Sequence, residues 1–257
     1  MRKSVLAICL VSMFLCGCIR SFASMDHSKL VGAGYNLLNA ASLNEKEAKA
    51  MSLAMRQRDD AKNRVAPPNS PYTQRLNRLM ANLASVNGTP LSYKVYMTNE
   101  VNANAAPDGS VRVYSGLMDK MDDDELRFVL GHEIGHVAKG HSLNAMRMAY
   151  ATEAARQAAG SLNATASALS DGQLGALGKA FFNAQFSQSQ ESDADAYAMQ
   201  FLKNNHYNTA AAGSALRKLS DGRRGGVMEA MFSTHPNPLD RAEKMDKLAG
   251  VAPVNSN

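Results

Sequence analysis

The sequence has no tryptophan, only 6% of its residues are aromatic, and no run of five like charges occurs in its 257 residues. The formal net charge is +5, but Arg2 and Lys3 belong to a segment that we expect to be removed. Without them 26 basic residues oppose 23 acidic ones, a net charge of +3. Neither a base-stacking platform nor a basic stripe is indicated, so we expect no nucleic-acid partner.

Cysteine is absent from most of the chain. The three cysteines, Cys9, Cys16 and Cys18, all lie in the first 18 residues. The remaining 239 residues therefore form no disulfide and rely on a hydrophobic core for stability. With 45% hydrophobic and 20% charged residues, the composition is that of a globular protein.

Long apolar runs are also lacking. The eleven-residue run Val5–Leu15 is shorter than the about 20 residues that a membrane-spanning helix needs. Because basic residues precede it, it is typical of a secretory signal. It ends in Leu15-Cys16-Gly17-Cys18, which resembles the lipobox of bacterial lipoproteins. We predict a signal peptide at residues 1–17 and lipidation of Cys18, with cleavage after Ser21-Phe22-Ala23 as the alternative.

This N-terminus predicts a lipoprotein of the cell envelope that faces the periplasm and meets the membrane through its N-terminal lipid. Ile19, rather than aspartate, follows the lipidated cysteine, which favours the outer membrane. We expect a tether at residues 18–42, one domain at residues 43–250 and a short tail at residues 251–257.

Local patterns predict an α+β fold that is mostly helical with a small sheet. Leu43–Val65 is expected to be an amphipathic helix that the proline-rich stretch of residues 66–71 ends, and Tyr72–Val86 a second helix. Leu91–Thr98 and Ser110–Tyr114 alternate as strands do, and helices are expected from there to the end.

The strongest motif is His132-Glu133-Ile134-Gly135-His136. Asp122 and Glu125 have the spacing of a capping box that begins a helix. At about 100° per residue, His132 and His136 lie about 40° apart on that helix and can share one Zn²⁺. Glu133 lies within the apolar stripe, where a carboxylate is costly unless it has a task such as deprotonating water. The motif is short enough to occur by chance on an ordinary helix.

Another predicted helix, Ser189–Lys203, supports the interpretation of His132 and His136 as metal ligands. Glu191 and Asp195 lie on its apolar face, whereas Asp193 lies on the opposite side. Zinc held by two histidines needs a third protein ligand, which Glu191 can provide, and one position open for water. Asp195 can accept the outer N–H of a ligating histidine.

His141 is an alternative third ligand, as in metzincins. Their pattern has glycine and histidine where this chain has Lys139 and Ser142. If the helix continues, His141 lies on its far side. We therefore predict a helix-end or surface position for His141, and exposed positions for the isolated His27 and His206.

Together with E-S-D-A-D at residues 191–195, Ser233-Thr234-His235-Pro236 and Arg241, the H-E-I-G-H motif resembles the HtpX/CAAX-protease family of zinc metallopeptidases, and in particular its envelope lipoproteins. The resemblance covers about residues 70–248 and includes Asn102-Ala103-Asn104-Ala105 with Val111–Leu117, which is similar to the family's strand pair. The chain departs from the family in lacking transmembrane helices and in having Pro107-Asp108-Gly109 where relatives often have Pro-Gly-Gly.

The resemblance implies a zincin-type fold with one zinc per chain. It implies His132, His136 and Glu191 as ligands and Glu133 as the catalytic base. It further implies Asp195 as a partner of a ligating histidine, and His235 and Arg241 near the transition state. The alternatives are a capped loop histidine for His235 and a surface ion pair for Arg241. Substrate is expected to lie extended along the sheet edge at Asn102, Ala103 and Asn104.

These observations predict a zinc endopeptidase that acts on unfolded or envelope polypeptides in protein quality control, with other envelope proteases or chaperones as candidate partners. The rival hypothesis is a non-catalytic, zinc-stabilised chaperone or scaffold. Structural zinc sites usually fill all four positions with protein ligands, so Glu133 beside a three-ligand set favours the enzyme.

Overall fold

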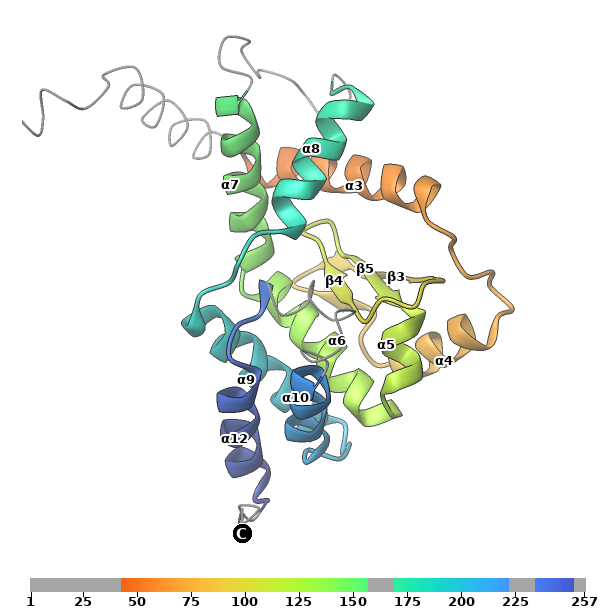
Figure 1. The fold of residues 1–257 in the computed structure, drawn as a ribbon, viewed down its shortest axis with the longest axis vertical. Helices are drawn as coiled ribbons and strands as arrows, with labels where there is room; N and C mark the ends of the chain where they lie inside the picture. The colour runs from red at the N-terminus through yellow and green to blue at the C-terminus, as the bar shows by residue number, and fades with distance from the viewer. Residues whose placement is uncertain (1–42, 157–168, 222–233, 252–257) are drawn as a thin grey trace, which may run out of the picture.

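The computed structural model describes residues 43–156, 169–221 and 234–251 (Figure 1). The predicted signal peptide, Cys18, the tether, His27 and most of the predicted tail lie outside these residues. In the part of the chain that is described, no helix is long and apolar enough to cross a membrane. The prediction of a mostly helical α+β fold with a small sheet is confirmed.

The main sheet has three short strands in the order β3-β5-β4. β3 (Ser92–Tyr96) runs parallel to β5 (Ser110–Tyr114), and β4 (Ala103–Ala105) pairs with β5 in antiparallel fashion. The two strands expected from alternation are thereby confirmed. The expected family strand Val111–Leu117 is too long, because Ser115 begins the short helix α5 (Ser115–Lys120).

The second predicted helix, Tyr72–Val86, is wrong at its end. Helix α4 covers only Pro71–Leu79, and Ser85–Val86 (β1) pairs with Thr89–Pro90 (β2). Asn87 and Gly88 connect these strands with φ of 48° and 75°. An Asn-Gly pair with both φ angles positive is the preferred two-residue hairpin turn, and it outweighed the helical spacing of the preceding leucines.

Helix α3 (Glu45–Lys62) confirms the first predicted helix and begins with a capping box between Asn44 and Glu47. One side of α3 is apolar and packs against α7 (His141–Arg156) and α8 (Asp171–Phe182) in a second, smaller core cluster. Another side carries a polar stripe at 3- and 4-residue spacing. Each of its members bonds to the sheet or its loops: Lys49 to Thr89, Ser52 to Asp108, Arg56 to Asn104, and Asp60 to Lys94, Tyr96 and Arg112.

The sheet therefore has two different faces. Val111, Val113, Ala103 and Ala105 are buried in the main hydrophobic cluster with α6 (Asp123–Ala138). On the opposite face, Asn104 and Arg112, which are register partners, meet the polar stripe of α3. The alternation of a strand places these two sets on opposite faces.

Helices α6 and α9 (Gln188–Asn204) make the most extensive helix pair, and α10 (Ala211–Asp221) and α12 (Pro238–Ala249) lie beside them (Figure 1). The predicted capping box of Asp122 and Glu125 begins α6. The two helices approach closely at Gly131 and Gly135. A Cβ atom at Gly135 would lie 3.0 Å from backbone atoms of Ala194, and one at Gly131 would lie 3.3 Å from Ala198 Cα. Any larger residue here would move the helices apart.

Candidate metal centre

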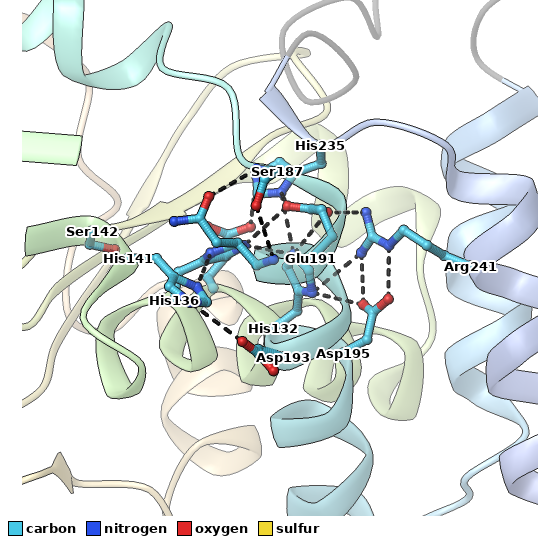
Figure 2. A network of polar contacts seen from close by, with 12 residues as sticks. His132, His136, His141, Ser142, Ser187, Glu191, Asp193, Asp195, His235 and Arg241 are labelled. Carbon is cyan, nitrogen blue, oxygen red and sulfur yellow. Dashed lines mark hydrogen bonds and ion pairs between the residues drawn. The ribbon is translucent and has the colours of Figure 1, made fainter. Parts of the chain in front are cut away.

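Four buried side chains from three segments converge on one point (Figure 2). Helix α6 contributes His132 and His136, α9 contributes Glu191, and the segment just before α12 contributes His235. Their candidate ligand atoms all lie within 4.8 Å of one another, and none of the four residues is more than 8% exposed. The predicted proximity of the two histidines and the predicted burial of Glu191 are confirmed.

The spacing of these atoms fits a small tetrahedral ion. Zinc bonds to nitrogen of 2.0–2.1 Å imply separations of about 3.3 Å between neighbouring ligands. His132 Nε2 lies 3.1 Å from His136 Nε2 and 3.6 Å from Glu191 Oε2, and His136 Nε2 lies 3.3 Å from Glu191 Oε1. The residues present therefore fit a bound zinc ion.

His235 adds a fourth donor to the expected three. Its Nδ1 atom lies 3.3 Å from His132 Nε2 and 2.9 Å from Glu191 Oε1. The capped-loop alternative for His235 does not describe this position. The structure thus brings four donors together where the sequence indicated three and an open position.

Glu133 lies beside this cluster and is 3% exposed. Its Oε1 atom has no hydrogen-bond partner among the described residues, and the nearest ionic contact of that atom is His235 Nε2 at 3.5 Å. Burial raises the pKa of the Glu133 carboxyl, because desolvation penalises the charged form. A buried carboxyl oxygen with no partner is costly in a folded protein and indicates a function.

Asp195 and Arg241 form the next layer behind His132. Asp195 Oδ1 lies 2.9 Å from His132 Nδ1, as predicted, and Arg241 donates both to Asp195 and to Glu191. Burial opposes ionisation of Asp195, but hydrogen bonds from His132 and Arg241 outweigh it and lower the pKa to about 2. Arg241 is 6% exposed, so the surface ion-pair alternative is wrong.

The prediction that His141 lies on the far side of the active helix is wrong, whereas His206 is exposed as expected. Helix α6 ends at Ala138 and Gly140 has a φ of 74°, so the chain turns before His141 begins α7. His141 is buried, and its Nδ1 lies 3.1 Å from Nδ1 of His136. A glycine just after a helical pattern is a helix stop signal, and it could have placed this histidine.

A cleft leads to the cluster, and Glu133 and His235 line it. One wall is formed at β4 by Asn102, Ala103, Asn104 and Ala105, and another at the end of α8 and just after it by Phe181, Phe182, Asn183, Ala184 and Phe186. The three residues predicted to bind substrate, Asn102, Ala103 and Asn104, therefore lie in the wall at β4.

Sequence reasoning missed two contributors to the cleft. Phe186 stacks on the His136 ring with centroids 3.7 Å apart. Arg56 of α3 is 1% exposed, donates to Asn104, and has its guanidinium carbon 4.5 Å from the centroid of the Phe182 ring. No local pattern could have found Arg56, because its partners lie 48 and 126 positions further along the chain.

Comparison with known proteins agrees with this geometry. Metalloprotease YcaL of Escherichia coli (strain K12) is 40% identical over 249 residues, which cover 96% of this chain and 97% of that protein. Metalloprotease LoiP of the same organism is 40% identical over 242 residues, which cover 94% of each chain. The Beta-barrel assembly-enhancing protease of Yersinia pestis is 33% identical over 175 residues, which cover 64% of this chain and 35% of that protein.

The model of Peptidase family M48 matches residues 69–249. This range includes α6, α9 and the segment that carries His235, and therefore all four donors of the cluster. The expected resemblance to a metallopeptidase family is confirmed, and the chain belongs to Peptidase family M48.

Proposed function

We propose that this metallopeptidase is a zinc-dependent endopeptidase of the bacterial cell envelope that hydrolyses unfolded or envelope proteins in quality control. The observation that carries the proposal is the buried Oε1 of Glu133, which has no hydrogen-bond partner among the described residues and lies beside a cluster of four potential metal ligands. One ion per chain follows from the single group of metal-binding donors among the described residues.

His132, His136 and Glu191 would hold the ion, since they come from two helices packed tightly together. Zinc held at this position would supply Lewis-acid chemistry, polarising a peptide carbonyl and lowering the pKa of water. Asp195 accepts the outer N–H of His132 and so fixes which ring nitrogen faces the cluster.

Glu133 acts as general base and then as general acid. Its carboxylate takes a proton from the attacking water and returns it to the amine that leaves when the peptide bond breaks. The raised pKa of this buried carboxyl suits both steps, because a base with a pKa closer to neutrality also releases its proton readily as an acid.

The substrate lies extended along the free edge of β4. Asn102 O accepts from Tyr114 N, and Ala106 N donates to Ser110 O, so alternate residues of this strand bond to β5. In an antiparallel ladder the intervening residues, Ala103 and Ala105, direct their backbone groups away from the partner strand. Ala105 O accepts from Ser142, so the backbone groups of Ala103 and the N–H of Ala105 would pair with a polypeptide in the cleft, as in strand addition.

His235 and Arg241 have separate tasks in this proposal. Catalytic zinc sites keep one position open for water, so we assign His235 to the reaction and not to the holding of the ion. From the segment beside Glu133, its ring would donate a hydrogen bond to the transition state. Arg241 neutralises Asp195 and Glu191 from behind.

The envelope location rests on the predicted lipidation of Cys18 and on one relative's name. The Yersinia relative is named for β-barrel assembly, and bacterial β-barrels of this kind span the outer membrane. We propose that the chain is an outer-membrane lipoprotein that faces the periplasm and cooperates with other envelope proteases or chaperones. Its domain spans residues 43–250, preceded by a tether.

The competing function is a non-catalytic, zinc-stabilised chaperone or scaffold, and the fourth donor His235 is the observation that favours it. Glu133→Gln separates the two, because the amide matches the carboxylate in shape but cannot accept the proton. Loss of the base should lower the rate of casein digestion by roughly 10²–10⁴ while zinc content and melting temperature are retained. If Glu133→Gln digests casein as fast as the wild type, the mechanism is wrong. If Glu133→Gln is inactive, proteomic comparison of cell envelopes that carry the wild type or this variant would identify the substrates.

A further inference from the structure

His141 lies next to His136, the second histidine of the H-E-x-x-H motif (Figure 2). The motif itself gives no role to His141. Its Nδ1 is 3.1 Å from His136 Nδ1, and the two rings meet edge to face with centroids 5.2 Å apart. His141 is 7% exposed, so water does not compete for this contact.

The turn between α6 and α7 creates the contact. Gly140 has a φ of 74°, a backbone conformation that residues other than glycine rarely adopt. Asn144 N donates to Gly140 O in the first turn of α7. Ser142 then bonds to Ala105 O of β4. The start of α7 is thus attached to the sheet, with the His141 ring directed at His136.

We propose that His141 is a positioning residue that orients His136 toward the metal. The inference rests on the proposed function, because it requires that the cluster binds an ion. If His136 presents Nε2 to the cluster, its proton is on Nδ1 and is donated to Nδ1 of His141. The other nitrogen of His141, Nε2, then carries the proton and faces Asp193 Oδ2 at 3.8 Å.

Each motif histidine therefore has its own outer partner. His132 has the carboxylate of Asp195 at 2.9 Å, and His136 has the imidazole of His141 at 3.1 Å. The two partners come from different helices, α9 and α7. Outer partners of ligating histidines fix the ring orientation and the tautomer, and their loss typically weakens metal binding 10–100-fold.

The test is the zinc dissociation constant of the full chain, measured by competition with a chelating dye in the absence of substrate. His141→Ala should weaken zinc binding 10–100-fold. His141→Asn should recover most of the affinity, because its side-chain oxygen occupies nearly the position of Nδ1. His206→Ala, which removes an exposed histidine, should bind zinc as the wild type does.

Equal affinity in wild type and His141→Ala would overturn the proposal, as would an equal loss in His206→Ala. If His141→Ala does not fold, His141→Asn and His141→Leu provide a pair of similar size, and equal affinities in that pair also refute it. A wild type that binds no zinc refutes the proposed function together with this inference. A wild type that binds zinc but cleaves nothing refutes only the proposed catalysis.

Discussion

Arg241 and Asp195 form a two-point ion pair in the interior: Nε lies 2.8 Å from Oδ2 and Nη2 lies 2.7 Å from Oδ1. The pair joins α12 to α9, and the same guanidinium also contacts Glu191. One buried cation thereby neutralises two buried acids that lie within one turn of α9. The resemblance implied Arg241 near the transition state, and the structure shows that Arg241 contacts the carboxylates of Asp195 and Glu191.

Arg241→Met should destabilise the metal-free protein by about 3–5 kcal/mol, because it leaves two buried carboxylates without a cation. Urea unfolding in the presence of a chelator measures this loss. Arg217→Met is the matched control, since the Arg217 side chain is 42% exposed and forms an ion pair with Asp246; it should cost about 1 kcal/mol or less. Similar losses in both variants would contradict the role assigned to Arg241.

Glu191→Ala should lose most of the bound zinc, whereas Asp193→Ala should retain it. The two acids are neighbours on α9, but Glu191 is 1% exposed and faces the cluster, while the Asp193 side chain is 58% exposed. Metal content after dialysis, measured by atomic absorption, distinguishes them. Equal content in the two variants would show that the cluster is not the binding site.

Both the start of α6 and the acidic pair on α9 could be predicted from local pattern. Asp122 and Glu125 formed the expected capping box, and spacing alone placed Glu191 and Asp195 on a buried face. The position of His141 next to His136 could not be predicted from helical periodicity, because periodicity assumes that α6 continues through Gly140. Periodicity describes a helix only as far as its end.

Asp60→Asn should destabilise the protein by about 1–2 kcal/mol at pH 7. Burial alone would raise the pKa of Asp60, but hydrogen bonds from Arg112, Lys94 and Tyr96 outweigh it and lower the pKa to about 2. A carboxylate with a depressed pKa contributes stability above its unfolded value, about 3.9, and loses that contribution as the pH falls toward 2. The magnitude allows for partial solvent screening.

The measurement is urea unfolding of wild type and Asp60→Asn at pH 7, 4 and 3. The difference between the two free energies of unfolding should be full at pH 7 and smaller at pH 3. A difference that does not change with pH would mean that the charge of Asp60 is not what stabilises the fold.

Arg56→Met should raise the KM for peptides more than it lowers kcat. Arg56 bonds to Asn104 in one wall of the cleft and lies against Phe182 in the other, so its removal should loosen both walls without touching the donor cluster. Steady-state kinetics on a casein-derived peptide separates the two constants. Arg58→Met, on the same helix but bound to Asp171, should leave KM unchanged.

The contribution of α3 to the cleft could not be predicted. Leu43–Val65 had the pattern of an ordinary amphipathic helix, and its apolar side does pack as expected. The polar stripe of Lys49, Ser52, Arg56 and Asp60 would normally be assigned to solvent. Only the three-dimensional structure shows that the polar face of the sheet covers it.

Cys18→Ala should abolish incorporation of labelled fatty acid and release the chain from the membrane fraction, because the acylated cysteine is the predicted anchor. Cys16→Ala is the control, since Cys16 belongs to the predicted signal peptide. Wild type and Cys18→Ala both recovered as soluble protein cleaved after Ala23 would favour plain secretion instead.

The contact of Gly131 and Gly135 with Ala198 and Ala194 has a consequence for ion selectivity. These residues set the distance between α6 and α9, and the same two helices carry His132, His136 and Glu191. A methyl group at Gly135 would require a shift of several tenths of an ångström, whereas metal–ligand bonds tolerate only about 0.2 Å. The separation of the donors, and with it the size of the ion that they could hold, would thus depend on two residues that have no side chain.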